Sequence, residues 1–594
     1  MTAAHRRRTP GAAGRLVVVV ALLAVACGSP IDPITTIAPS SVRPSIAARP
    51  SLAPFAKSAW PPTGDAPCGE AAQPDPTHAA YSGNLKRISA PNATTIVFEL
   101  CSPDVAFLAQ IAQPAFSIND SGWLKSHVTT AAGGPAQIVT QMNGTGPYRL
   151  ESWDHGSEVS LARNEAYWGA PAKNERVIVR WLANSSQQVK ELQDGTVDGV
   201  ADIAPNDLQS VTDDVGLTLA PRSGLNIAYL GFKTGVPPFS NEKVRQAVAI
   251  GLDRQRIVDA GFPAGSLLAS HYTPCAVPHG CAGAGWYDSD PTLAREMLTA
   301  AGFPNGFDTT IEYNATPRPS LPDPAAVVGE LQTQLLANLG IRAMLTIAPP
   351  ETFFADAEAG GLAGIHILER TAAIPDATAF LDPRFGPGAP PEFGPPFTDI
   401  GKALASGRST ADPDKREVAY GKANAAIRTH VPLIPVAYSG SAAAFRADVV
   451  GAGASALGLE RFALMAPGDR RQFVWSTTRE PPGLYCADET DPVAKLVCAQ
   501  VMDTLYAFDP TGATPLPSLA RGCEPDPSLT VWTCTLRPGV RFGDGSGLDA
   551  SDVVLSFAVQ WDAEHPLHRG DSGSFSTFAS TFGGFLHPPV APGG

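Results

Sequence analysis

Residues that could carry out catalysis are scattered along this sequence and do not form a known catalytic pattern. The sequence contains neither a GxSxG nucleophile motif nor an HExxH metal-binding motif. His565 and His568 lie close together, but Pro566 between them opposes a helix that would align both rings. The stretch from Gly543 to Gly547 lacks the lysine and the spacing of a phosphate-binding loop and is typical of a turn. We therefore expect a protein that is not an enzyme.

The first residues indicate export. Arg6, Arg7 and Arg8 precede an apolar run that is too short to span a bilayer, followed by small residues before Cys27. The sequence from Leu23 to Ser29 resembles the lipobox of bacterial lipoproteins, in which the cysteine becomes the lipidated first residue. It predicts a lipoprotein signal peptide over residues 1–27, with lipidation of Cys27. Secretion with ordinary cleavage before Cys27 is the alternative.

A tether is predicted to follow the signal peptide. Residues 28–62 are rich in Pro, Ser and Ala and show almost no apolar periodicity, which is typical of an extended, semi-rigid linker. No later stretch has the length and hydrophobicity of a membrane-spanning helix. The N-terminal lipid is therefore the only membrane contact that we expect.

Apart from Cys27, the sequence has an even number of cysteines, which favours disulfides in an exported chain. Spacing suggests local pairs and leaves two cysteines over. The suggested pairs are Cys275 with Cys281, Cys486 with Cys498, and Cys523 with Cys534, and the remaining two are Cys68 and Cys101. Sequence alone does not fix the connectivity. A zinc site is the alternative, but no CxxC motif occurs, and we predict no metal and no other cofactor.

The composition indicates a folded, acidic protein. The chain has 594 residues, of which 44% are hydrophobic and 17% charged, and its formal net charge is -14. This length and hydrophobic fraction predict two or three packed lobes with large cores. The negative charge repels phosphate backbones, so we expect no nucleic-acid partner.

Alternating strand-like and helix-like segments predict an α/β architecture. Strands are expected at residues 95–100 and 177–181, and helices at 187–192, 241–252 and 324–339. Strand-like residues 309–313 and 343–347 flank the last of these helices as a βαβ unit, with Gly340 placed to end the helix.

Several motifs in the middle of the chain resemble those of one known family. The motifs are Gly144–Tyr148 with Trp153, Arg163–Gly169, Leu192–Asp198, Pro237–Arg254 and Ala301–Phe307. Together they resemble the signatures of the family 5 extracellular solute-binding proteins, which are the peptide- and nickel-binding partners of ABC importers.

The last third of the chain supplies what this family normally carries first. The segments concerned are Phe473–Trp475, Leu519–Ala520, Leu536–Phe542, Asp544–Ser546 and Asp552–Phe557. This order suggests a circular permutation. A full-length protein fused to a truncated second copy is the alternative, but no such segment is found before residue 80.

The resemblance implies an α/β fold of the periplasmic-binding-protein type II, circularly permuted. Two main lobes and a smaller lobe are expected, with a hinge cleft between the main lobes. The implied boundaries are 80–143 and 506–594 for the smaller lobe, 144–225 and 438–505 for lobe I, and 226–437 for lobe II. Crossing strands are expected near residues 224–230 and 434–438.

The family's peptide binders place a carboxylate against the ligand's amino group, and in this sequence Ala373 stands at that position. The usual amine anchor is therefore missing. Arg370, which replaces the family's Trp, can instead bind a carboxylate or phosphate through its planar guanidinium. Glu369 or Asp376 can supply a displaced amine contact. The alternative is that Arg370 and Glu369 simply face solvent.

Four more residues are ligand candidates because of their places in the family pattern. Tyr485 and Glu480 belong to a loop that corresponds to the family's first ligand-facing turn, and Asn226 and Tyr229 lie beside a predicted crossing strand. For the two tyrosines, packing in the core is the alternative.

The resemblance implies an extracytoplasmic, lipid-anchored monomer that delivers a peptide or another small solute to an ABC permease. A ligand-binding lipoprotein that serves a signalling receptor is one alternative. A binder of a non-peptide ligand, either anionic, nickel or haem, is another.

Overall fold

The computed structural model describes residues 55–69, 80–128, 136–222, 224–263, 265–372, 374–570 and 572–588. The predicted signal peptide with Cys27, most of the predicted tether and Ala373 lie outside these residues. Ser58–Trp60 forms strand β1, which pairs antiparallel with β2 (Leu85–Asn92). The tether prediction is therefore wrong for its last residues, because their backbone groups belong to a sheet.

A six-stranded sheet organises residues 226–438, which we call the six-stranded lobe. Its order is β10-β14-β9-β13-β11-β12. The strands are β9 (Asn226–Phe232), β10 (Leu267–Leu268), β11 (Asp308–Tyr313), β12 (Arg342–Ile347), β13 (Ile365–Thr371) and β14 (Leu433–Tyr438). β11 runs parallel to β12 and to β13, whereas β9 runs antiparallel to β13 and β14.

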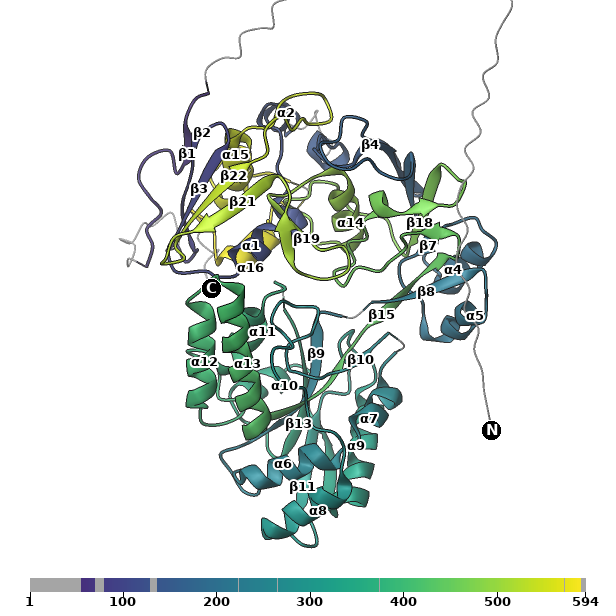
Figure 1. The fold of residues 1–594 in the computed structure, drawn as a ribbon, viewed down its shortest axis with the longest axis vertical. Helices are drawn as coiled ribbons and strands as arrows, with labels where there is room; N and C mark the ends of the chain where they lie inside the picture. The colour runs from purple at the N-terminus through teal and green to yellow at the C-terminus, as the bar shows by residue number, and fades with distance from the viewer. Residues whose placement is uncertain are drawn as a thin grey trace, which may run out of the picture. The chain divides into compact units, whose positions relative to one another are not determined.

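Helices cover both faces of this sheet (Figure 1). They are α6 (Glu242–Gly251), α7 (Arg254–Gly261), α8 (Pro291–Ala300), α9 (Pro324–Leu339), α10 (Phe353–Glu358), α11 (Ala377–Phe385), α12 (Thr398–Arg408) and α13 (Pro413–His430). Successive residues of β9 alternate between two cores. Ala228 and Leu230 pack with α6 to α9, and Ile227 and Tyr229 pack with α10 to α13. A strand buried on both faces explains the continuous apolar run in β9.

The βαβ unit follows the sequence prediction. Asp323 caps the first turn of α9 by accepting a hydrogen bond from the Ala326 amide, and Pro324 occupies the first helical position. Gly340 ends the helix with φ 68°, a left-handed conformation that suits glycine. β11 and β12 on either side of α9 pair in parallel from Asp308 to Tyr313.

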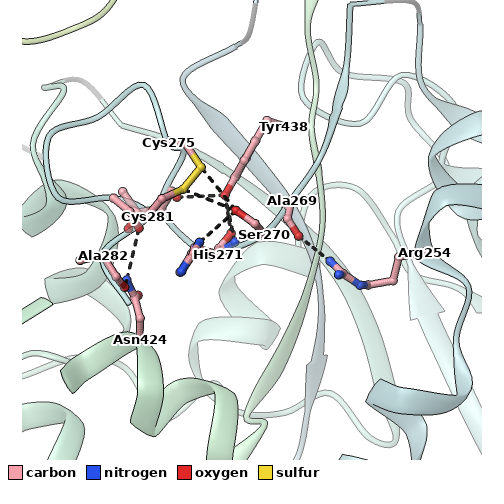
Figure 2. Close-up of a disulfide and its surroundings, with 11 residues drawn as sticks. Arg254, Ala269, Ser270, His271, Cys275, Cys281, Ala282, Asn424 and Tyr438 are labelled. Carbon is pink, nitrogen blue, oxygen red and sulfur yellow. Dashed lines mark hydrogen bonds between the residues drawn. A yellow bond between two sulfur atoms is a disulfide. The ribbon is translucent and has the colours of Figure 1, made fainter. Parts of the chain in front are cut away.

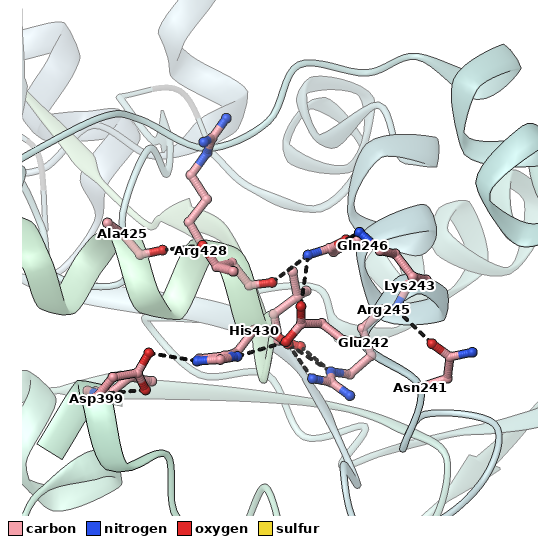
Figure 3. A network of polar contacts seen from close by, with 12 residues as sticks. Asn241, Glu242, Lys243, Arg245, Gln246, Asp399, Ala425, Arg428 and His430 are labelled. Carbon is pink, nitrogen blue, oxygen red and sulfur yellow. Dashed lines mark hydrogen bonds and ion pairs between the residues drawn. The ribbon is translucent and has the colours of Figure 1, made fainter. Parts of the chain in front are cut away.

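A charged network fixes one end of the six-stranded lobe (Figure 3). The two ring nitrogens of His430, at the end of α13, contact Glu242 of α6 at 2.7 Å and Asp399 of α12 at 2.8 Å. Burial alone would lower the pKa of His430, but these two carboxylates outweigh it and raise the pKa. The imidazolium thus links the neighbouring helices α12 and α13 to α6, which lies far from them in the sequence.

A seven-stranded sheet organises residues 148–222 and 441–501, which we call the seven-stranded lobe. Its order is β4-β5-β6-β18-β7-β15-β8. The strands are β4 (Tyr148–Asp154), β5 (Glu158–Arg163), β6 (Arg176–Trp181), β7 (Gly199–Val200), β8 (Leu217–Arg222), β15 (Ser441–Arg446) and β18 (Gln472–Thr477), and the helices are α4 (Ser185–Gln193), α5 (Leu208–Thr212) and α14 (Pro492–Val501).

The chain crosses twice between these two lobes, where the sequence predicts crossing strands. β8 leads into β9, and β14 leads into β15, each through only a few residues. The two connections are tied to each other, because the Asn226 side-chain amide donates to the Ser439 carbonyl at 2.8 Å and its side-chain oxygen accepts from the Ser439 amide at 2.8 Å. Such a pair of short connections is the geometry of a hinge.

Strands from both ends of the described chain form one five-stranded sheet, the core of the five-stranded lobe (residues 58–128 and 505–588). Its order is β1-β2-β3-β22-β21. The strands not yet given are β3 (Thr95–Leu100), β21 (Ala520–Pro525) and β22 (Val531–Leu536), and the helices are α1 (Phe107–Ile111), α2 (Ser121–His127), α15 (Ala550–Trp561) and α16 (Ser576–Phe582). The antiparallel pairing of β22 with β3 joins these distant segments, as Figure 1 shows. Circular permutation of the family order stays a prediction.

The remaining elements are short. They are α3 (Gln137–Thr140), the 3₁₀ turns Pro114–Phe116, Pro205–Asp207 and Phe462–Leu464, and the strand pairs β16 (Val449–Val450) with β17 (Ala466–Pro467) and β19 (Tyr506–Phe508) with β20 (Pro515–Pro517). None of the helices in the described part of the chain is long and apolar enough to cross a membrane.

Four disulfides lie within the described residues: the three local pairs that spacing suggested, and a bond between the two remaining cysteines, which are 33 residues apart. They are Cys68–Cys101, Cys275–Cys281, Cys486–Cys498 and Cys523–Cys534.

Candidate functional site

The carboxyl ends of the parallel strands mark the first candidate site. β11, β12 and β13 end at Tyr313, Ile347 and Thr371, at one edge of the six-stranded sheet. In open α/β sheets, ligands bind outside the carboxyl ends of the strands. The same edge borders the crossing connections, since Thr371 is paired with Asn226. This strand-end site therefore lies next to the hinge.

Glu369, a predicted ligand residue, forms an ion pair in the strand-end site. Nε and Nη2 of Arg318 lie 2.5 and 3.0 Å from the Glu369 carboxylate. The Arg318 guanidinium also lies over the ring of Phe354, 4.5 Å from its centroid. The charge of Glu369 is thus already paired with Arg318 of the same chain. Arg318 lies far from Glu369 in the sequence, and no sequence pattern pointed to it.

Arg370 is partly buried beside Glu369. Its Nε and Nη2 donate to the Ala379 carbonyl at 3.2 and 2.9 Å, which fixes the guanidinium against the start of α11. With Arg318, it places two guanidinium groups and one carboxylate at the strand ends. The excess positive charge suits an anionic group of a ligand.

Asp376 is buried and has a structural role. Both of its carboxylate oxygens accept from Nη2 of Arg416, at 2.8 and 2.9 Å, and one of them caps α11 by accepting from the Thr378 amide. Burial alone would raise the pKa of Asp376, but Arg416 outweighs this effect and lowers the pKa.

Asn226 and Tyr229 are both engaged in the six-stranded lobe. Asn226 ties the hinge connections together, as described above. The side chain of Tyr229 is fully buried, and its hydroxyl donates to Glu392 at 2.9 Å. This arrangement is the core packing that the sequence analysis gave as the alternative for the tyrosines.

Tyr485 and Glu480 lie away from the strand ends. Tyr485 is buried in the core of the five-stranded lobe, with its ring against Phe575. Glu480 accepts hydrogen bonds from the Trp153 indole at 2.9 Å and from the Gly156 amide at 3.1 Å. The structure therefore brings Glu369 and Arg370 together, with Asn226 nearby, and places Tyr485 and Glu480 elsewhere.

A second candidate site is a cavity of about 540 Å³ between the six-stranded and five-stranded lobes. Among the predicted residues, Asp376 lines it. The other lining residues are Val105, Ala106, Leu108, Ala109, Pro278, His279, Pro375, Ala411, Pro413, Arg416, Thr514, Pro515, Cys523, Glu524, Pro525 and Trp532. Its volume falls in the range of small-molecule sites, roughly 300–1,000 Å³. Sequence analysis missed this cavity because its walls come from segments that are distant in the chain.

The loop closed by Cys275–Cys281 contributes Pro278 and His279 to this cavity. Figure 2 shows how the loop is held: the Tyr438 hydroxyl donates to the His271 carbonyl at 2.8 Å, and the Asn424 amide donates to the Ala282 carbonyl at 2.9 Å. A rigid loop of this kind gives the cavity a fixed wall.

The same loop holds a group of potential metal ligands. A ring nitrogen of His271 and the sulfurs of Cys275 and Cys281 lie within 4.8 Å of one another. The two sulfurs are joined in a disulfide, whereas metal ions bind thiolates. In the oxidised form these residues therefore serve the loop rather than a metal.

Comparisons with known proteins identify the family. The family described as bacterial extracellular solute-binding proteins, family 5 middle, matches residues 57–391. Heme-binding protein A of Haemophilus influenzae is 27% identical over 402 residues, which cover 64% of this chain and 69% of that protein. Di/tripeptide-binding protein 1 of Pseudomonas aeruginosa is 26% identical over 377 residues, covering 61% and 68%.

A solved structure shows the same fold. HbpA2 from Haemophilus parasuis superposes with a TM-score of 0.59 at 26% identity, covering 64% of this chain and 75% of that one. The lobed α/β architecture is that of type II periplasmic binding proteins. The family match spans more than half of the chain and includes β9 to β13 of the six-stranded sheet and the connection from β8 to β9, so this chain belongs to the family 5 bacterial extracellular solute-binding proteins.

Proposed function

We propose that this protein binds a small solute outside the cytoplasm and delivers it to the permease of an ABC importer. The observation that carries the proposal is the hinge: two sheets of a family 5 solute-binding protein are joined by short crossing connections that Asn226 and Ser439 tie together. Two lobes that rotate about such connections can open to admit a solute and close over it.

The strand-end site supports a solute with an anionic group. Arg318 and Arg370 outnumber Glu369 there, and Ala373 replaces the carboxylate that would bind an amino group. Relatives are described by name as binding heme, di- and tripeptides or glutathione. A peptide carboxylate, or another small anion, fits the charge of this site.

The experiment is mass spectrometry of the small molecules released when the purified protein, lacking residues 1–27, is denatured. Arg370→Ala is expected to lose an anionic solute that the unchanged protein carries. Arg256→Ala is the matched control, because Arg256 is an exposed residue of α7 that pairs with Glu330. Equal loss of the solute in both variants, or a solute without an anionic group, would contradict the role of Arg370.

We also propose that the protein is a monomer held at the cell membrane by a lipid on Cys27. The lipid anchor rests on the sequence from Leu23 to Ser29. Cys27→Ser is expected to release the protein from the membrane fraction and to remove the mass of the lipid from its N-terminus. An unchanged distribution and mass would contradict lipidation.

A further inference from the structure

The cavity between the six-stranded and five-stranded lobes has apolar walls. On one side, Leu108 of α1 and Trp532 of β22 contribute apolar surface, and on the other side Pro278 and Pro375 do so. Trp532 is buried and stacks on Phe107 at 5.2 Å between ring centroids, so this wall is fixed by the core behind it. Such walls suit the hydrocarbon part of a ligand.

The two lobes touch beside this cavity. Ala513, from the five-stranded lobe, is fully buried in the core of the six-stranded lobe, and Ala411, from the six-stranded lobe, packs against the core of the five-stranded lobe. A ligand in the cavity would therefore contact both lobes and stabilise this contact.

The charges around the cavity are mostly negative. Arg416 is neutralised by Asp376. His279 is paired with Glu417, whose carboxylate lies 2.8 Å from Nδ1. Glu524 lies exposed in the cavity wall, and its carboxylate makes no hydrogen bond or ion pair within the described residues. The cavity therefore offers one carboxylate that has no cation of its own.

Asp104 is a buried carboxyl beside the cavity, in the five-stranded lobe. It immediately precedes the lining residues Val105 and Ala106, and its carboxylate accepts from the Ala106 amide at 2.9 Å and from the Gln110 side chain at 2.7 Å. Burial raises the pKa of Asp104, and the charge of Asp376 in the other lobe raises it further. The Asp104 carboxylate is thus already hydrogen-bonded within its own lobe, which leaves Glu524 as the carboxylate open to a ligand.

We propose that this cavity is a second binding site, which takes a small organic cation: an ammonium group on an aromatic or alkyl body. Glu524 accepts hydrogen bonds from the ammonium, and the body packs against Leu108 and Trp532. The site differs from the proposed strand-end site in both location and charge preference.

Isothermal titration calorimetry with tryptamine tests the proposal, with indole-3-acetate as a probe of the same ring and opposite charge. The unchanged protein is expected to bind tryptamine and to bind indole-3-acetate much more weakly. Glu524→Gln, an exposed substitution, is expected to weaken tryptamine binding at least about tenfold, since the amide oxygen can still accept a hydrogen bond but the negative charge that pairs with the ammonium is lost. Glu524→Asp is expected to keep part of the affinity.

Glu296→Gln is the matched control, because Glu296 is exposed on α8 and does not line the cavity. No tryptamine binding, equal binding of both probes, or equal affinity in Glu524→Gln and the unchanged protein would overturn the proposal. The solute released on denaturation is measured in the same variants. If Glu524→Gln still carries this solute, the cavity is separate from the strand-end site. Loss of the solute is expected only with Arg370→Ala, so the two proposals can fail independently.

Discussion

The buried ion pair of Asp376 and Arg416 allows a prediction with a calculable size. Both side chains are less than one tenth exposed, at 5% and 8%. Replacing Arg416 with Met leaves the Asp376 carboxylate buried without a cation, and breaking a buried pair in this way costs about 3–5 kcal/mol of unfolding free energy. For a unit the size of the six-stranded lobe, each kcal/mol of lost unfolding free energy lowers the midpoint of thermal unfolding by roughly 2–4 °C.

The double variant Asp376→Asn with Arg416→Met should recover most of this loss. Asn keeps the acceptor that caps α11 at the Thr378 amide, and no charge remains buried. Urea and thermal unfolding of the full chain measure the three variants. Arg256→Met, which removes an exposed arginine from its pair with the partly buried Glu330, is the control and should cost no more than about 1 kcal/mol.

The pH dependence provides an independent check. The folded pKa of Asp376 lies below its ordinary value of 3.8, so the pair contributes stability above that pH and loses it as the pH falls through the folded pKa. The stability gap between the unchanged protein and Arg416→Met should therefore narrow in acid. The reasoning is refuted if Arg416→Met costs no more than Arg256→Met, or if the double variant is as unstable as the single one.

Two more predictions concern the helix network and the hinge. The raised pKa of His430 means that its pairs with Glu242 and Asp399 stabilise the fold below pH 6.5 and lose this effect as the pH rises through the folded pKa. The difference in thermal midpoint between the unchanged protein and His430→Gln should therefore shrink as the pH rises. A difference that stays constant with pH would contradict this prediction. Asn226→Ala removes both hydrogen bonds between the crossing connections and should lower the free energy of unfolding by about 1–3 kcal/mol, as measured by urea unfolding. The affinity for the solute, measured by calorimetry, should change as well. An unchanged unfolding free energy or an unchanged affinity would contradict this role of Asn226.

Local sequence patterns were sufficient to predict several strands and helices of the lobes. The strand expected at residues 95–100 is β3 (Thr95–Leu100), and the helix expected at 324–339 is α9 (Pro324–Leu339). These segments carry their own signals, such as the cap at Asp323 and the left-handed Gly340. The family motifs then indicated how the segments combine into lobes.

The roles of the candidate site residues could not be predicted in the same way, because their partners are distant in the sequence. Glu369 depends on Arg318, Asp376 on Arg416, and Glu480 on Trp153. Nothing in the local pattern around a carboxylate tells whether a cation will reach it after folding. Burial also depends on residues that are distant in the sequence, since the ring of Tyr485 packs against that of Phe575.

The pairing of β3 with β22 has a consequence for how the protein reaches its native state. Closing a contact between segments from opposite ends of the described chain has a high entropic cost, which slows folding. Until β22 is available, β3 presents an open edge to any other extended segment, including the same strand of a second molecule. The five-stranded lobe should therefore mature last, and we expect incomplete chains to be the species most prone to aggregation and to recognition by chaperones.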